Sequence, residues 1–99
     1  MGAREFLEVD PTKLRLPGSR RSGADLRKLQ RQFSRFGTST KGMPPLEVSR
    51  GNDGELVIND GVTRATRIAR YATGTSVIVE VVDELPIPGR AFPTIGETL

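Results

Sequence analysis

Short runs of alternating apolar and polar side chains predict three β-strands in the first two thirds of the chain. In residues 4–9 alternate positions are apolar, and an Asp-Pro pair, typical of a turn, follows them. Residues 46–50 and 55–58 alternate or are apolar on either side of a Gly-Asn-Asp-Gly sequence at 51–54. Two such runs joined by such a turn predict a β-hairpin, in which the Asn and Asp serve turn geometry rather than metal binding.

Helical periodicity predicts two helices. The first has an apolar stripe that we expect in the core; its members are Leu26, Leu29, Phe33 and Phe36. Ser22 and Asp25 have the spacing of a capping box, which predicts a start there, and Gly37 predicts the end. The second helix is predicted to begin with Asp60 as its N-cap and to end near residues 73–74. Its apolar positions are Val62, Ala65, Ile68, Ala69 and Ala72.

The last third of the chain contains one strong strand and a change of composition. Residues 77–82 are almost all apolar, which predicts a strand that is central in its sheet or covered on both faces. After Asp83, Pro and Gly become frequent and predict an extended tail without further regular structure. The sequence therefore predicts one α+β domain over residues 1–84 and a Pro/Gly-rich C-terminal tail over 85–99. The domain has the order β-α-β-β-α-β, with a small mixed sheet packed against two main helices.

Composition restricts the chemistry. The 99 residues include no Cys and no His. Disulfides, thiolate nucleophiles, Cys or imidazole metal sites and Ser-His pairs are therefore excluded. The longest apolar runs are too short to span a bilayer, so we expect no membrane partner.

Charge is distributed unevenly along the chain. The net charge is +3, yet residues 13–41 contain nine Lys or Arg and one acid, Asp25. Twelve of the fifteen cations are Arg, whose planar guanidinium suits bidentate contacts to phosphate. This bias favours an anionic partner. The alternative is a solvated helix face without a specific ligand.

The candidate chemistry lies at residues 59–64, where a predicted strand runs into the second helix. Gly61 allows close approach of the backbone, and the free N–H groups of a first helical turn attract anions. Thr63 adds a hydroxyl and Arg64 a guanidinium, while Arg67 extends a basic strip along the helix. The alternative interpretation is that Asp60 only caps the helix and Gly61 only permits a tight turn.

The hairpin, the turn Asp60-Gly61-Val62-Thr63-Arg64 and the strand at 77–81 resemble the ParB/sulfiredoxin superfamily over residues 6–83. Members bind nucleotide or nucleic-acid phosphates at the start of the corresponding helix. The resemblance thus implies this role for Gly61, Thr63 and Arg64. The segment 16–21 resembles the basic box of the family that faces the same site, which implies that Arg20 and Arg21 also contact phosphate.

Two positions depart from the enzymes of this superfamily. Val62 stands where sulfiredoxins have Cys and Thr63 where they have His, so sulfinic-acid reduction is excluded. Chromosome-partition ParB proteins have an acidic residue and a second Arg here, which puts CTP hydrolysis in doubt. The chain is more similar to small ParB-like domains, including nuclease-type toxin domains. The resemblance therefore implies a cytoplasmic location, or secretion within a larger toxin chain.

Three functions are open at this point. The first is a module that binds nucleotide or nucleic-acid phosphates without cleavage, with Arg27 and Arg31 adding to the arginines named above. The second is a nuclease that uses Mg²⁺, in which Asp60 or Glu47 acts as base or metal ligand and Arg64 stabilises the transition state. The third is an interaction domain whose basic face binds an acidic protein. Because one Tyr and four Phe are the only aromatic residues, and the core or tail can use every Phe, we expect little stacking on bases.

Overall fold

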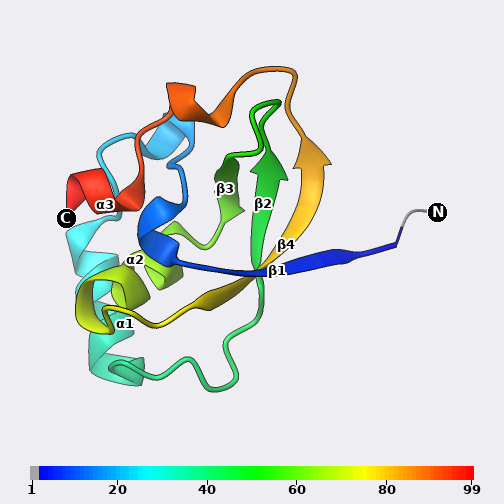
Figure 1. Ribbon diagram of the computed structural model, residues 1–99. Helices are drawn as coiled ribbons and strands as arrows, with labels where there is room; N and C mark the ends of the chain where they lie inside the picture. Colours follow the sequence, from blue (N-terminus) through cyan, green and yellow to red (C-terminus); the bar gives the residue numbers. More distant parts are fainter. Residues whose placement is uncertain (1–2) are drawn as a thin grey trace.

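The computed structural model describes residues 3–99 (Figure 1). The strands are β1 (Glu5–Val9), β2 (Leu46–Arg50), β3 (Leu56–Asp60) and β4 (Val77–Glu84), and the helices are α1 (Leu26–Phe36), α2 (Val62–Tyr71) and α3 (Ile95–Thr98). Single 3₁₀ turns occur at Pro11–Lys13, Gly18–Arg20 and Gly89–Ala91. The predicted order β-α-β-β-α-β and the α+β class are confirmed. Within residues 3–99, no helix has the length and apolar character needed to cross a membrane.

The four strands form one mixed sheet in the order β1-β4-β2-β3. β1 pairs antiparallel with β4 and β2 antiparallel with β3, whereas β2 and β4 are parallel. β4 is an inner strand, as predicted. Ile78 and Val82 on its outward face are 43% and 45% exposed, so side chains cover β4 on one face. Figure 1 shows the helices gathered on one side of the sheet.

The core lies between the sheet and α2. Ala65, Ile68 and Ala69 of α2 are buried there, which confirms the apolar face predicted for this helix. Leu14 and Leu16 add to the core from an extended segment beside β3, where Arg15 forms bridges with Val57 and Thr94. The remaining buried members of the core are Leu46, Val48, Ile58, Val77, Val79 and Ile95.

The apolar stripe of α1 is largely outside the core, contrary to the prediction. Leu29 is buried, but Leu26 is 68% exposed, Phe33 40% and Phe36 43%. The reason is that α1 packs on α2 at the edge of the molecule instead of lying on the sheet. Phe33 stacks on Tyr71 of α2, with ring centroids 4.2 Å apart.

The ends of α1 are set by Asp25 and Gly37. The carboxylate of Asp25 accepts hydrogen bonds from the amides of Arg27 and Lys28 at 2.9 and 3.1 Å. The Lys28 bond is the main reason that the pKa of Asp25 lies below its ordinary value. The expected start at Ser22 is therefore wrong by three residues. Gly37 ends the helix as predicted, with φ of +57°.

Residues 85–99 contain regular structure that the composition did not predict. Gly89–Ala91 forms a 3₁₀ turn and Ile95–Thr98 a short helix, capped by reciprocal hydrogen bonds between Thr94 and Glu97. Ile95 is fully buried in the core. The prediction of an extended segment is wrong because frequent Pro and Gly prevent long elements but permit single turns.

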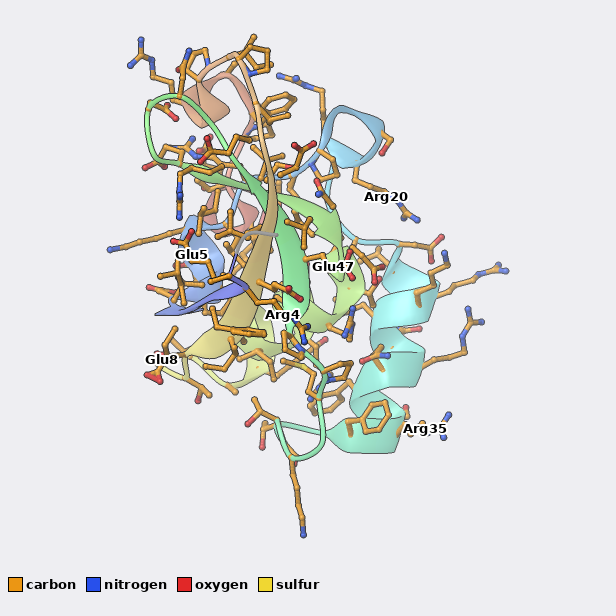
Figure 2. All side chains as sticks on the ribbon, turned by 90° about the vertical axis from the view of Figure 1, so that its right-hand side faces the viewer. Arg4, Glu5, Glu8, Arg20, Arg35 and Glu47 are labelled. Atoms are coloured by element: carbon orange, nitrogen blue, oxygen red, sulfur yellow. The ribbon has the colours of Figure 1, made fainter. Side chains whose placement is uncertain are left out.

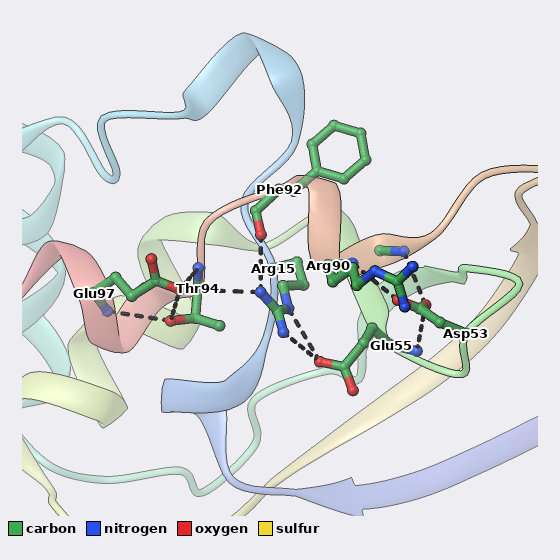
Figure 3. Close-up of polar contacts among 8 residues, drawn as sticks. Arg15, Asp53, Glu55, Arg90, Phe92, Thr94 and Glu97 are labelled. Carbon is green, nitrogen blue, oxygen red and sulfur yellow. Dashed lines mark hydrogen bonds and ion pairs between the residues drawn. The ribbon is translucent and has the colours of Figure 1, made fainter.

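Polar contacts attach this C-terminal segment to the hairpin and to residue 15 (Figure 3). The carboxylate of Asp53 accepts hydrogen bonds from the amides of Gly89 and Arg90 at 2.9 and 3.0 Å. Arg15 donates to Glu55 Oε1 at 2.7 Å and to the carbonyl of Phe92 at 3.0 Å. The hairpin turn thus also holds a segment that lies more than thirty residues later in the chain.

Candidate phosphate-binding site

A pocket of about 310 Å³ lies at the start of α2 and is called the α2 pocket below. Its lining comes from three segments that are distant in sequence: the 3₁₀ turn near residue 19, one side of α1, and residues 59–64. The lining residues outside 59–64 are Pro17, Ser19, Arg20, Lys28 and Gln32. The structure therefore brings together five of the predicted site residues, namely Arg20, Asp60, Gly61, Thr63 and Arg64.

The first turn of α2 has no side-chain cap. Gly61 is the N-cap residue, and no side chain accepts a hydrogen bond at this end of the helix. Asp60, predicted as the N-cap, is instead the last residue of β3, one position too early to cap. The amides at the start of the helix thus remain available to an acceptor from outside, which is the arrangement that binds anions.

Gly61 is required by the backbone at this turn. Its φ is +111°, in the region that favours glycine. A Cβ atom at this position would lie 2.4 Å from Cδ2 of Leu46 and 3.1 Å from Nη2 of Arg64. The guanidinium of Arg64 therefore folds back over the start of its own helix.

This position places a cation at the positive end of the α2 dipole, which is unfavourable without a nearby anion. Arg64 donates to Asp60 Oδ2 at 3.2 Å and to the carbonyl of Pro44 at 3.3 Å. The Asp60 side chain is 75% exposed, so this ion pair is a weak surface contact. An anionic ligand on the α2 amides would balance the same charge.

Two lining residues escaped sequence reasoning. Lys28 and Gln32 project from α1 into the α2 pocket, but only the packing of α1 on α2 shows which side of α1 faces the turn. The sequence shows that α1 is basic, but it does not show which of its residues face the pocket. Figure 2 shows Arg20 beside the first turn of α1 and Arg35 beside its last turn.

Arg67 lies outside the α2 pocket and is 2% exposed. Its Nη1 donates to the carbonyls of Gly37 and Ser39, both at 2.8 Å, and its guanidinium lies 5.4 Å from the ring centroid of Phe36. Burial lowers the pKa of Arg67. These contacts attach the loop after α1 to α2, so the structure gives Arg67 a position that holds the fold together.

Arg21, another predicted phosphate ligand, also lies apart from the α2 pocket. It is exposed, and Nη2 lies 3.5 Å from the carbonyl of Ala91 in the C-terminal segment. The 3₁₀ turn at Gly18–Arg20 separates the directions of the two adjacent arginines, so that Arg20 alone lines the pocket.

The two carboxylates considered for a nuclease, Glu47 and Asp60, are partners across the β2–β3 ladder. A metal ion in a protein usually has further oxygen or nitrogen ligands nearby. In the part of the chain that the structure describes, no group of three or more acidic residues is placed to hold a metal ion. Within residues 3–99 this pair thus has no third acidic ligand, and a Mg²⁺ ion there would be held by the two carboxylates together with water and substrate phosphates.

The α2 pocket combines free amides, the Thr63 side chain and cations from three segments of the chain. Amide and hydroxyl donors suit the oxygens of a tetrahedral oxyanion, and Arg and Lys balance its charge. The geometry supports anion binding. No protein-family model, curated protein or solved structure matches the chain.

Proposed function

We propose that the domain binds the phosphate groups of a nucleotide or a nucleic acid in the α2 pocket. The observation that carries the proposal is the convergence of Arg20, Lys28 and Arg64 on an uncapped helix start. Asp60 is the one acidic residue that lines the same pocket. Uncapped helix ends and small groups of surface cations are each common in proteins. Together, around one concave site, they favour the binding of an anion.

Each part of the pocket has a distinct role in this proposal. The amides of the first α2 turn and the Thr63 hydroxyl donate to phosphate oxygens. Arg64 turns from Asp60 toward the ligand and adds charge-assisted hydrogen bonds. Arg20 and Lys28 neutralise the remaining charge from the opposite wall.

We also propose that the fold is related to the ParB/sulfiredoxin superfamily. The proposal is supported by the element order and by a strand that leads directly into a helix through Gly61. The Gly-x-x-Arg spacing of Gly61 and Arg64 is the feature in common with the family. Because Val62 and Thr63 differ from the residues of the known enzymes, we propose binding and not the reactions of those enzymes.

The binding proposal is tested with a nucleoside triphosphate and a short oligonucleotide at low salt, by calorimetry and fluorescence anisotropy. We expect Arg20→Ala and Arg64→Ala each to lower affinity about ten- to a hundredfold, since a charge-assisted hydrogen bond is worth about 1.5–3 kcal/mol. Arg90→Ala removes the same charge from an exposed site outside the pocket and should change affinity less than about twofold. Unchanged affinity in a folded Arg64→Ala variant would contradict the proposal.

Asp60→Asn separates binding from hydrolysis. In a binding module this change removes a carboxylate that competes for Arg64, so phosphate affinity should rise. Plasmid DNA and tRNA incubated with the protein and Mg²⁺ should stay intact. Cleavage that Asp60→Asn abolishes would replace the binding proposal by the nuclease alternative.

A further inference from the structure

The α2 pocket continues into two neighbouring pockets along α1. The α1 pocket, of about 410 Å³, shares Lys28, Gln32 and Thr63 with the α2 pocket and extends to Arg31, Arg35 and Phe36. The loop pocket, of about 150 Å³, lies against residues 39–44 and also contacts Gln32 and Phe36. The three pockets share walls, and together they are called the cationic groove.

The groove is strongly basic. The exposed or half-buried cations that line it are Arg20, Lys28, Arg31, Arg35, Lys41 and Arg64. Asp60 is the one acidic residue among its lining residues. Arg31 and Arg35 are one helical turn apart, about 6 Å along the axis, a spacing that suits successive phosphates of an extended strand.

An aromatic side chain and an unpartnered amide lie inside this basic surface. Phe36 is 43% exposed and borders both the α1 pocket and the loop pocket. Gln32 borders all three pockets, and its Oε1 is buried without a hydrogen-bond partner among residues 3–99. A phosphate does not require either group, whereas a base offers a face for Phe36 and a polar edge for Gln32.

We infer that the ligand is a single-stranded nucleic acid several nucleotides long, an inference that rests on the proposed phosphate site. One phosphate occupies the α2 pocket and the strand follows Lys28, Arg31 and Arg35. The guanidinium of Arg35, which lies 5.3 Å from the ring centroid of Phe36, turns to a phosphate, and a base takes its place on the ring. A mononucleotide fills one pocket and leaves the cations of the others without phosphate. A duplex keeps its bases stacked on one another, so their faces do not reach Phe36.

The length dependence of binding tests this inference. The probes are a nucleoside triphosphate, fluorescein-labelled ten-residue oligo-dT and oligo-U, and a twenty-base-pair duplex at equal salt. We expect both oligonucleotides to bind at least tenfold more tightly than the triphosphate and the duplex. Their log affinity should fall with log salt with a slope of about −3, for four phosphate contacts on a single strand at about −0.7 each.

The outcomes separate this inference from the proposed function. Equal affinity for the triphosphate and the oligonucleotides overturns the single-strand inference and leaves the phosphate site intact. Tighter binding of the duplex also overturns it. Loss of binding for every probe overturns both. Oligo-U and oligo-dT distinguish RNA from DNA, since the 2′-hydroxyl is the main difference in recognition.

Charge variants on α1 test the path of the strand. Arg31→Ala with Arg35→Ala should weaken oligonucleotide binding and reduce the salt slope by about 1.4, with triphosphate affinity unchanged. Arg90→Ala removes one charge from an exposed site outside the groove and should have less than a twofold effect. An equal loss from Arg90→Ala would overturn the path along the groove.

The stacking contact has its own test. Phe36→Leu should lower oligonucleotide affinity about fivefold or more without changing the salt slope, because stacking involves no counterion release. Phe33→Leu is the matched control, since Phe33 is equally exposed, contacts Tyr71 and lies outside the groove. Thermal unfolding of both variants checks the fold. Unchanged affinity in a folded Phe36→Leu variant would overturn the stacking contact and with it the preference for single strands.

Discussion

At residue scale, Gly61 combines a positive φ with tight packing against Leu46. Gly61→Ala should lower the free energy of unfolding by about 2–6 kcal/mol, since backbone strain and overpacking each cost about 1–3 kcal/mol. Gly42→Ala is the control, because φ is +73° there but no atom lies within 4 Å of the added Cβ. Gly42→Ala should lower the free energy of unfolding, measured with urea, by about 1–2 kcal/mol. Equal losses would contradict the packing argument.

Arg67 gives a second prediction at this scale. Arg67→Met keeps a side chain of similar apolar bulk but removes the donors for the carbonyls of Gly37 and Ser39. The free energy of unfolding should therefore fall by about 1–3 kcal/mol. Arg70→Met, an exposed site on the same helix, should change stability by less than about 0.5 kcal/mol. A stable Arg67→Met variant that loses phosphate affinity would instead place Arg67 in the binding site.

The chemistry of individual residues was predictable from sequence where it depends on neighbours in the chain. Gly61, Thr63 and Arg64 lie together because a few residues of turn and helix geometry place them there. Arg67 differs from Arg64 by three positions, and periodicity does not show that a loop from α1 covers it. Arg21 lies outside the α2 pocket because of the direction of a single 3₁₀ turn, which the sequence pattern does not show.

At the scale of elements, the helical and strand patterns correctly predicted α1, α2 and the hairpin. The pattern of α1 defines an apolar side, but its burial depends on how much neighbouring structure reaches it. α1 packs mainly on α2, so Leu29 is buried and Phe36 remains exposed. The sequence pattern places Phe36 in the core because it shows an apolar side of the helix but not how much of that side is buried.

The contact between the hairpin turn and the C-terminal segment should depend on pH. Desolvation opposes ionisation of Asp53, but hydrogen bonds from the amides of Arg90, Gly89 and Glu55 outweigh it and lower the pKa of Asp53 below its ordinary value. A lowered pKa stabilises the fold fully above the ordinary value, and this stabilisation is lost as pH falls through the lower folded value. Asp53→Asn should thus reduce the urea midpoint at pH 7, and its difference from the parent should shrink as pH falls and Asp53 becomes protonated.

The control for this pH series is Glu8→Gln, since Glu8 makes no side-chain hydrogen bond or ion pair within the part of the chain that the structure describes. Urea unfolding of the three proteins between pH 2 and pH 7 gives the comparison. A constant difference between Asp53→Asn and the parent over that range would show that the carboxylate charge contributes nothing to the contact.

At the scale of the whole molecule, the C-terminal segment completes the core. Ile95 is fully buried, so Ile95→Ala should lower the free energy of unfolding by about 2–5 kcal/mol. Ile87→Ala removes the same atoms from a side chain that is 45% exposed and should cost less than about 1 kcal/mol. Similar losses in the two variants, measured by urea unfolding, would mean that residues 85–99 do not share the core.

The strand order has a consequence for the way the chain folds as it is synthesised. β1 precedes the other three strands along the chain, yet its partner in the sheet is β4, so β1 has no ladder until residues 77–81 have left the ribosome. The hairpin and α2 rely on neighbours close in sequence and can form earlier. Nascent chains arrested before β4 should therefore present an unpaired β1, and a chaperone that recognises extended apolar segments would bind β1 rather than the strands that follow it.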